Sequence, residues 1–488
     1  MRKLFKILLR LAVFIGMSVL VFMLYNALTV DSRQIVTDPV EKVEIADTAI
    51  TRLSAGIRLP TVSAGAIDST AFRNLDTLLQ VSFPLVDSLL EREQVNDFGY
   101  IYKWPGTNPR LEPILLLGHT DVVAADANDK DWAVPPFSGA IRDGCIWGRG
   151  ALDDKLSVFG ILEATEMLLA EGYDPERTVY FAFGQDEEVG GKKGAIPMSR
   201  FFAERGITFE YILDEGSVIL KNALDGLDKP LAMIGISEKG YTTLTLTAVL
   251  ENGGHSSMPP PETAVGVLAA AVTALQDNPF PSKIDGATRL FFEYIAPECA
   301  FPQKILFSNL TLTEGLITRQ LSKDNTSAAI LRTTTAPTML RGGIQENVLP
   351  RRASAKVNFR ILPGETVESV REYVRQIIDD KRILVEVSDP EFSNDPPPLS
   401  PTESFGFQVI QKTIGQTFPQ AVTTPSLVIA TTDARHYSAV SPNIYRFMPL
   451  QISRTDLKTI HGINEKIAAE GYKDMIRFYR QLIVNSCK

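Results

Sequence analysis

Histidine and acidic residues follow short apolar runs in several widely separated parts of the chain. They are His119 and Asp121 in LLLGHTDVV, Asp153 in GRGALDDK, Glu187 and Glu188 in FGQDEEVGG, Asp214 in YILDEG, and His461 in TIHGINE. Imidazole and carboxylate groups are ligands that zinc accepts, and zinc sites of this kind activate water. The set therefore predicts a centre that holds two zinc ions and catalyses hydrolysis.

The apolar runs before these residues indicate buried parallel strands. Residues 114–117, 179–183 and 211–213 are short and rich in β-branched or aromatic side chains. In open α/β sheets, ligands bind outside the carboxyl ends of the strands. We therefore expect these runs to deliver their polar residues to one edge of a sheet.

Each of these residues also has an ordinary structural interpretation. His119 alone could be a loop residue, and Asp153 precedes a helical pattern over 156–169, where a carboxylate suits the helix N-terminus. Glu187 and Glu188 could form a solvated acidic turn. Two adjacent carboxylates repel each other unless a cation or a proton lies between them. The joint occurrence of all these residues favours the metal site.

Several longer motifs support this interpretation by resemblance. GHTDVV, WAVPPF, DGCIWGRGALDDK, DEEVGG, LDEG and the late IHG resemble the co-catalytic zinc peptidases that include aminoacylase, carboxypeptidase S and succinyl-diaminopimelate desuccinylase. LDDK, LDEG and TTDARHY are most similar to the branch of carboxypeptidase S and the N-acyl-amino-acid hydrolases. The similarity extends from about residue 45 to the C-terminus. It implies an α/β catalytic domain, with a mixed sheet flanked by helices, and an inserted lid domain.

The resemblance implies a role for each matched residue. The implied ligands of two Zn²⁺ per chain are His119 for one ion, Glu188 and His461 for the other, Asp153 as the bridge, and Asp214 as the remaining ligand. Glu215 is the alternative to Asp214, because family members use either position. Asp121 is expected to orient His119 through its second ring nitrogen. Glu187 is expected to be the general base.

These roles imply hydrolysis of an amide next to a free carboxylate. Water activated by the two ions would lose its proton to Glu187, and the same residue would then protonate the departing amine. The substrate would be a small peptide or an N-acyl amino acid, cleaved by a carboxypeptidase or an N-acyl-amino-acid amidohydrolase. A dipeptidase is the first alternative. A non-catalytic, membrane-tethered relative is the second, although every matched position holds a competent residue.

The middle of the chain follows a different pattern. Its expected elements are a strand over 241–249, a helix over 262–275, strands over 328–334 and 355–362, a helix over 367–378, and a strand over 383–387. This βαββαβ order is ferredoxin-like. It resembles the inserted lid domain of the family, which implies a lid over 239–390 between catalytic segments 46–238 and 391–488. The Pro-rich stretch 388–402 is the expected return linker. Residues 276–326 are interpreted as a packing insert, with the lining of an apolar channel as the alternative.

Further residues are assigned to the substrate by the resemblance. His255, in GGHSS, would stabilise the oxyanion, in dimeric members from the neighbouring subunit, and the lid would carry the homodimer contact. An ordinary hairpin turn is the alternative for this motif. Asn347 and Arg435 match positions that hold the substrate and its carboxylate, and the planar guanidinium suits the second task. His436 receives no role, because a packed or solvated histidine is the commoner case.

The N-terminus predicts the location of the protein. Basic residues precede an uncharged stretch over 11–30, which at ~1.5 Å per residue spans a ~30 Å hydrocarbon core. Residues 1–30 are therefore expected to be a single-pass anchor with a cytoplasmic N-terminus, followed by a tether over 31–45. A cleaved signal, giving a secreted or periplasmic protein, is the alternative. The net charge of −9 argues against nucleic-acid binding, and the three widely spaced cysteines suggest neither a disulfide framework nor a thiolate zinc site.

Overall fold

The computed structural model describes residues 1–65, 67–126 and 128–488. Its main sheet has the strand order β1-β2-β6-β3-β7-β17-β9-β8-β18, and β16 pairs with β9. These strands are β1 (Glu91–Val95), β2 (Gly99–Trp104), β3 (Ile114–His119), β6 (Val179–Gly184), β7 (Tyr211–Asp214), β8 (Ile219–Leu220), β9 (Leu231–Glu238), β16 (Val422–Val428), β17 (Ile444–Arg446) and β18 (Gln451–Ile452). The predicted strands at 114–117, 179–183 and 211–213 are confirmed as parts of β3, β6 and β7.

The centre of the sheet is parallel and buried on both faces. β3 pairs in parallel with β6 and β7, so that Ile114 lies opposite Val179 and Tyr211. Side chains alternate along β3: Leu116 belongs to one apolar core and Leu117 to the core on the other face. This two-sided burial explains why the strands are continuous apolar runs rather than alternating patterns.

Helices cover both faces of the main sheet. α5 (Lys155–Ala170) and α15 (Ala469–Ser486) contribute to the larger core, and α6 (Ala195–Glu204) to the smaller one. The remaining helices of this part are α2 (Thr48–Ile57), α3 (Ser69–Ser82), α4 (Pro84–Leu89), α13 (Phe405–Thr417) and α14 (Arg454–Leu457). The architecture is a mixed α/β fold, as predicted.

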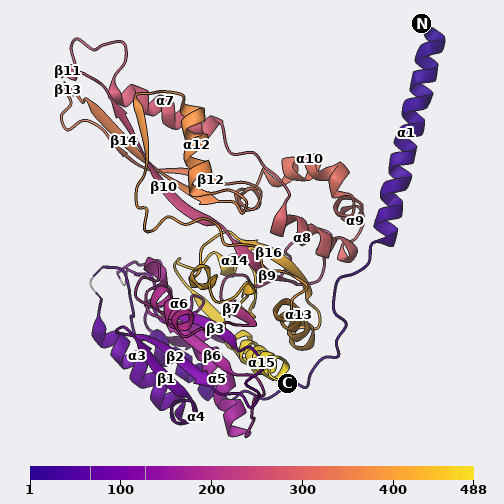
Figure 1. Ribbon diagram of the computed structural model, residues 1–488, viewed down its shortest axis with the longest axis vertical. Coiled ribbons are helices and arrows are strands. Elements are labelled where there is room, and N and C mark those ends of the chain that lie inside the picture. Colours follow the sequence, from indigo (N-terminus) through magenta and orange to yellow (C-terminus); the bar gives the residue numbers. More distant parts are fainter. Residues whose placement is uncertain (66, 127) are drawn as a thin grey trace.

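A second unit extends away from the main sheet (Figure 1). Its strands are β10 (Gly240–Val249), β12 (Thr334–Arg341), β14 (Arg352–Ile361) and β15 (Ile383–Val387), arranged in the order β12-β14-β10-β15 with antiparallel pairing. α7 (Ala264–Asp277) and α12 (Val367–Ile378) share an apolar core with this sheet. A small hairpin of β11 (Gly254–His255) and β13 (Val348–Leu349) forms the far tip.

The strand expected over 328–334 is wrong, because β12 begins only at Thr334. The preceding apolar residues end the short helix α11 (Asn325–Ala329), and Leu331 is buried in a separate core. That core belongs to the segment between α7 and β12, which contains α8 (Gly286–Ile295), α9 (Gln303–Phe307) and α10 (Leu310–Leu321). Phe292 and Phe307 are buried there, and α8 packs against β16.

The chain begins with α1 (Arg2–Thr29), a helix of 28 residues that is long and apolar enough to cross a membrane. Residues 31–46, here called the strap, have no regular structure but are bound to the body of the protein. The Gln34 side chain exchanges two hydrogen bonds of 2.8 Å with the backbone of Thr423, and the Val40 N–H donates to the Gln416 carbonyl. The strap is therefore hydrogen-bonded to the body at Gln34 and Val40.

Candidate metal centre and active site

The candidate ligands lie at the ends of strands of the main sheet and in the segments next to them. His119 is the last residue of β3, and Glu188 lies in η1 (Glu187–Val189), which follows β6. Asp153 lies just before α5, and Glu215 follows the end of β7. His461 comes from the loop between α14 and β19 (Lys466–Ala468) and adopts a left-handed φ of 58°, which is uncommon outside functional or tightly constrained positions.

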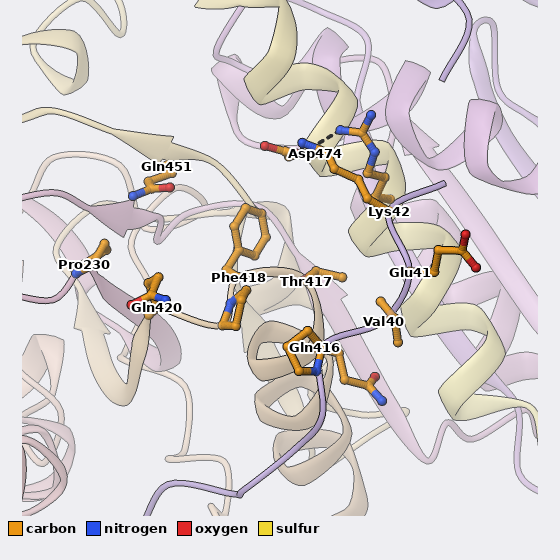
Figure 2. A pocket seen from close by; sticks show the side chains of 14 residues that line it. Val40, Glu41, Lys42, Pro230, Gln416, Thr417, Phe418, Gln420, Gln451 and Asp474 are labelled. Atoms are coloured by element: carbon orange, nitrogen blue, oxygen red, sulfur yellow. Dashed lines mark hydrogen bonds and ion pairs between the residues drawn. The ribbon is translucent and has the colours of Figure 1, made fainter. Parts of the chain in front are cut away.

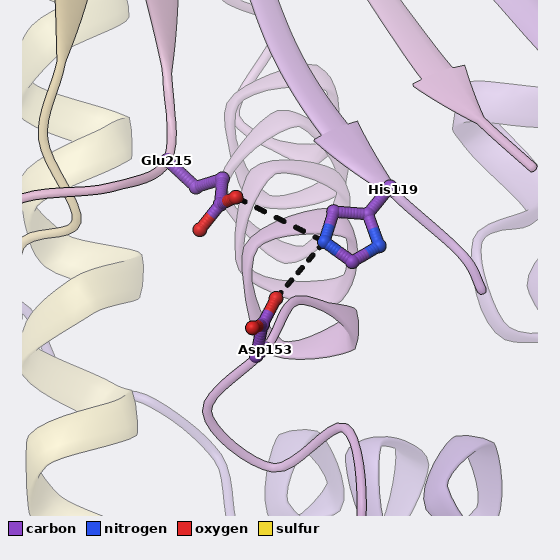
Figure 3. Close-up of side chains that lie close together, drawn as sticks. All are labelled: His119, Asp153 and Glu215. Atoms are coloured by element: carbon purple, nitrogen blue, oxygen red, sulfur yellow. Dashed lines mark hydrogen bonds and ion pairs between the residues drawn. The ribbon is translucent and has the colours of Figure 1, made fainter. Parts of the chain in front are cut away.

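The first candidate metal group combines His119, Asp153 and Glu215 (Figure 3). The His119 Nε2 atom lies 2.9 Å from Asp153 Oδ1 and 3.9 Å from Glu215 Oε1. The His119 side chain is 2% exposed, and the side chains of Asp153 and Glu215 are 13% and 12% exposed. An imidazole nitrogen and two carboxylate oxygens thus face one another with little water around them, which is a donor set that zinc accepts.

The second candidate group shares one residue with the first. The His461 Nε2 atom lies 3.0 Å from Asp153 Oδ2 and 3.1 Å from Glu188 Oε2. Asp153 therefore turns one carboxylate oxygen toward His119 and the other toward His461. A carboxylate that bridges two cations needs this division of its oxygens.

Asp214, the preferred ligand in the sequence interpretation, is not brought into either group. Its buried carboxylate accepts the backbone N–H of Ala434 at 2.8 Å and that of Glu215 at 2.9 Å. The neighbouring Glu215 takes the expected position beside His119 instead. The physical reason is that Asp214 still belongs to β7, whereas Glu215 lies beyond the strand and turns to the other side.

Asp121 connects the first group to the turn that carries the paired glutamates. Its Oδ1 atom lies 3.3 Å from His119 Nδ1, the ring nitrogen that faces away from Asp153. The same carboxylate accepts the backbone N–H of Glu187 at 3.1 Å and that of Glu188 at 3.2 Å. Asp121 is fully buried. It is placed to orient both the imidazole and the turn.

The electrostatics of the two groups favour cations. Hydrogen bonds that the His461 imidazole donates to the Asp153 and Glu188 carboxylates raise the pKa of His461 to about 10. Burial raises the pKa of Glu215 well above its usual range, and the nearby charge of Asp153 adds to this effect. Among the described residues, Glu188 Oε1 is buried without a hydrogen-bond partner. Crowded carboxylates with an unused buried oxygen are stabilised by metal cations, so the donor set fits a two-metal centre.

Glu187 lies beside the two groups but belongs to neither. Its side chain is 11% exposed, and Arg435 Nη1 lies 4.0 Å from its Oε1 atom. Burial raises the pKa of Glu187 well above its usual range, against the lowering effect of His119. Gly190 follows the short turn with φ of 98°, a left-handed conformation that favours glycine. Two adjacent residues of this turn can therefore have different roles, with Glu188 as a candidate ligand and Glu187 as a candidate base.

Arg360 is a candidate that the sequence interpretation missed. It lies in β14, and its guanidinium carbon is 5.0 Å from the centre of the Tyr241 ring. Burial lowers the pKa of Arg360, and the charge of Arg435 acts in the same direction, while Glu187 is close enough to contribute. The motif VNFRILP contains no catalytic signature, so only the pairing of β14 with β10 reveals this position.

The residues predicted on the inserted unit lie apart from both groups. His255 and Asn347 are exposed and belong to the tip hairpin, where the Ser256 N–H donates to the Asn347 carbonyl. Figure 1 shows this tip at the end farthest from β3 and β7. His436 is packed behind the glutamate turn, and burial lowers its pKa to about 3, which keeps its ring neutral.

A pocket of about 340 Å³ lies elsewhere, between the strap and the end of α13 (Figure 2). Its lining includes Lys42, Phe418, Gln451 and Asp474. Among the described residues, those of the two metal groups do not line it. The chemistry therefore lies at the sheet edge and not in this pocket.

An α/β sheet whose edge carries two histidine and carboxylate groups joined by one aspartate is the arrangement of a two-metal hydrolase. The sequence model of Peptidase family M20/M25/M40 matches residues 115–485, and the chain belongs to this family. It is 43% identical over 446 residues to probable carboxypeptidase S-like 2 of Dictyostelium discoideum, covering 90% of this chain and 85% of that protein. It is 42% identical over 439 residues to N-fatty-acyl-amino acid synthase/hydrolase PM20D1.1 of Danio rerio, covering 88% and 84%.

The fold matches solved structures as well. The M20 family metallo-carboxypeptidase Sso-CP2 from Sulfolobus solfataricus aligns with a TM-score of 0.67 and 17% sequence identity. The alignment covers 90% of this chain and 99% of that chain. At this level of identity the match establishes the common fold.

Proposed function

We propose that this protein is a zinc-dependent hydrolase that cleaves the amide of N-acyl amino acids or small peptides next to a free carboxylate. One observation carries the proposal: Asp153 divides its two oxygens between His119 and His461, with Glu187 buried beside both groups. Five ligands, His119, Asp153, Glu188, Glu215 and His461, would hold two ions. The names of the carboxypeptidase S-like and N-fatty-acyl-amino-acid hydrolase relatives support this substrate class.

The chemistry assigns separate tasks to adjacent residues. Zinc, when bound, supplies a Lewis acid that lowers the pKa of water and polarises an amide carbonyl. Glu187 accepts the proton of the attacking water as the carbon–oxygen bond forms, and it gives that proton to the amine as the carbon–nitrogen bond breaks. Its buried position beside Arg435 keeps the carboxylate oriented for both transfers.

Arg435 and Arg360 are the residues proposed to bind the substrate carboxylate. Both guanidinium groups lie close enough to Glu187 for their charges to interact with its carboxylate. Two guanidinium groups kept close together repel each other, and an anion between them relieves that repulsion. A preference for substrates with a free carboxylate follows from this arrangement.

A substrate panel tests the proposed function. Purified full-length protein should release amino acids from acetyl, long-acyl and glycyl derivatives, lose activity with a chelator, and regain it with Zn²⁺. Arg435→Lys should lower kcat/KM on acids, by an amount equivalent to roughly 1–3 kcal/mol of transition-state stabilisation. The loss on the matching amides should be much smaller. Equal losses on acids and amides would remove Arg435 from the substrate site. Absence of bound transition metal in active protein would refute the metal mechanism.

His255 and Asn347 are proposed to act on a neighbouring copy. Their exposure at the tip hairpin, far from their own metal groups, supports a homodimer in which this unit serves as a lid. His255 would then donate a hydrogen bond to the oxyanion of the partner's substrate.

We also propose that α1 is an uncleaved membrane anchor with its basic end in the cytoplasm. Its length and apolar composition support this location, and they also suit a secretory signal. N-terminal sequencing of the membrane-bound protein distinguishes the two, because signal cleavage would remove α1.

A further inference from the structure

The two loops that carry Asp153 and His461 are joined by a buried ion pair. The Arg149 guanidinium donates to the Glu465 carboxylate through Nη1, and the two residues are 3% and 0% exposed. Arg149 stands four positions before Asp153, and Glu465 stands four positions after His461. The pair therefore links the segment before one candidate ligand to the segment after another.

Each partner of this pair also holds the backbone of the opposite loop. Glu465 Oε1 accepts the N–H groups of Gly150, Leu152 and Asp153 at 3.0, 2.8 and 3.3 Å. In return, Arg149 Nη2 donates to the Gly462 carbonyl at 3.0 Å. The contacts reach Asp153 itself on one side and the residue next to His461 on the other. We call Arg149 and Glu465 the loop clamp.

His461 depends on its loop for its position. Its side chain is 50% exposed, so packing restrains the imidazole on one side only. Beyond Glu465 the chain enters β19, which pairs with β5 (Cys145–Trp147) directly before Arg149. The loop clamp therefore restrains the short stretches of chain that connect the β5–β19 pairing to the two metal groups. By contrast, His119 is buried at the end of β3 and needs no such restraint.

We infer that Arg149 and Glu465 are positioning residues that set the separation of Asp153 and His461 and thereby create the second metal group. This inference rests on the proposed two-metal function. Loss of the clamp should weaken the group formed by Asp153, Glu188 and His461, while the group built on His119 and Glu215 persists. Residues that orient ligands without touching the metal change metal affinity by about tenfold to a hundredfold.

The test counts zinc in the full-length protein during titration with a competing chelator. Glu465→Gln keeps the oxygen that accepts the loop N–H groups but removes the charge that pairs with Arg149. At a chelator concentration where the wild type retains both ions, this variant should retain one. The affinity for the second ion should fall about tenfold to a hundredfold. Arg149→Lys keeps the charge but loses the forked geometry, and it should show a smaller loss of the same ion.

A matched control separates positioning from general stability. Arg52 of α2 and Glu163 of α5 form another ion pair outside the two metal groups, with Arg52 Nε 2.6 Å from Glu163 Oε1 and the Glu163 side chain 4% exposed. Glu163→Gln should lower resistance to urea but retain both ions. His461→Ala combined with Glu465→Gln should lose no more zinc affinity than His461→Ala alone, because both changes act on one group.

The outcomes distinguish the inference from the proposed function. Two tightly held ions in Glu465→Gln and Arg149→Lys would overturn the role of the clamp while leaving the two-metal centre intact. Equal zinc loss in Glu163→Gln would show that the effect reflects stability alone and would also overturn it. A wild-type protein without bound zinc would refute both the clamp and the proposed centre. Should Glu465→Gln fail to fold, Arg149→Lys decides the question by the same titration.

Discussion

The carboxylate of Asp121 accepts the backbone N–H of Glu187 at 3.1 Å, although the two residues are 66 positions apart in the chain. The same carboxylate accepts the N–H of Glu188 and lies beside His119 Nδ1. One buried side chain thus relates the imidazole of the first metal group to the turn that carries the proposed base. The backbone of this turn is held independently of the two glutamate side chains.

Substitution of the paired glutamates should therefore separate base from ligand. Glu187→Gln removes basicity but leaves the turn bound to Asp121, so kcat should fall on the order of 10²–10⁴-fold while the zinc content stays at two per chain. Glu188→Gln should instead reduce the zinc content. Turnover and elemental analysis of the same preparations check both expectations. A Glu187→Gln variant with near wild-type turnover would contradict the assignment of the base.

A second pair of adjacent carboxylates should also respond differently. Glu215→Gln should weaken zinc binding, because Glu215 faces His119 Nε2. Asp214→Asn should retain zinc but unfold more easily. The buried Asp214 carboxylate accepts the N–H groups of Ala434 and Glu215, and the substitution weakens these hydrogen bonds. Chelator titration and urea denaturation of both variants provide the measurements. The opposite pattern would restore Asp214 as the ligand.

Complementation should reveal whether His255 serves a neighbouring subunit. His255→Ala and Glu187→Gln are each expected to be nearly inactive. Mixed and reassembled, they should recover about a quarter of wild-type activity, because half of the dimers would be mixed and each would contain one complete site. Activity that stays at the level of the separate variants would place His255 outside the site of the partner.

The stability of the protein should increase with pH because of Lys239. Burial lowers the pKa of this amine to about 7 from 10.5, and its Nζ atom donates to the carbonyls of Ala329 and Arg332 at 2.7 Å. Between these pH values the unfolded chain binds more protons than the folded chain, so the free energy of unfolding rises with pH. Lys239→Met should remove a rise on the order of a few kcal/mol.

Urea denaturation between about pH 7 and 10 measures this dependence. Lys381→Met, at an exposed position in the turn before β15, should keep the wild-type rise. Parallel curves for the wild type and Lys239→Met would show that the buried amine does not cause it.

The sequence predicts the central strands well because burial on both faces leaves a clear pattern. β3, β6 and β7 are continuous apolar runs that end at polar residues, so both the strands and the polar edge can be inferred. α12 coincides with its predicted bounds, since its apolar spacing and the capping box from Thr366 to Ser369 agree. These features depend on local order along the chain.

Features that depend on side-chain direction or tertiary pairing are harder to infer. The choice between Asp214 and Glu215 turns on which residue ends β7, a difference of one position. The apolar residues before Thr334 suit a strand as well as the end of a helix, and only the core around Leu331 decides between them. Arg360 and the Arg149–Glu465 pair become visible only when segments far apart in the chain are brought together. The boundaries of the lid stay a prediction.

The bound strap has a consequence for maturation. Because Gln34 and Val40 hold residues 31–46 against the body, proteolysis after α1 would leave this segment in place. The released protein would then keep the same surface and the same catalytic core as the tethered one. With α1 as the proposed membrane anchor, a single cut after it would free the folded body with residues 31–46 still bound to it.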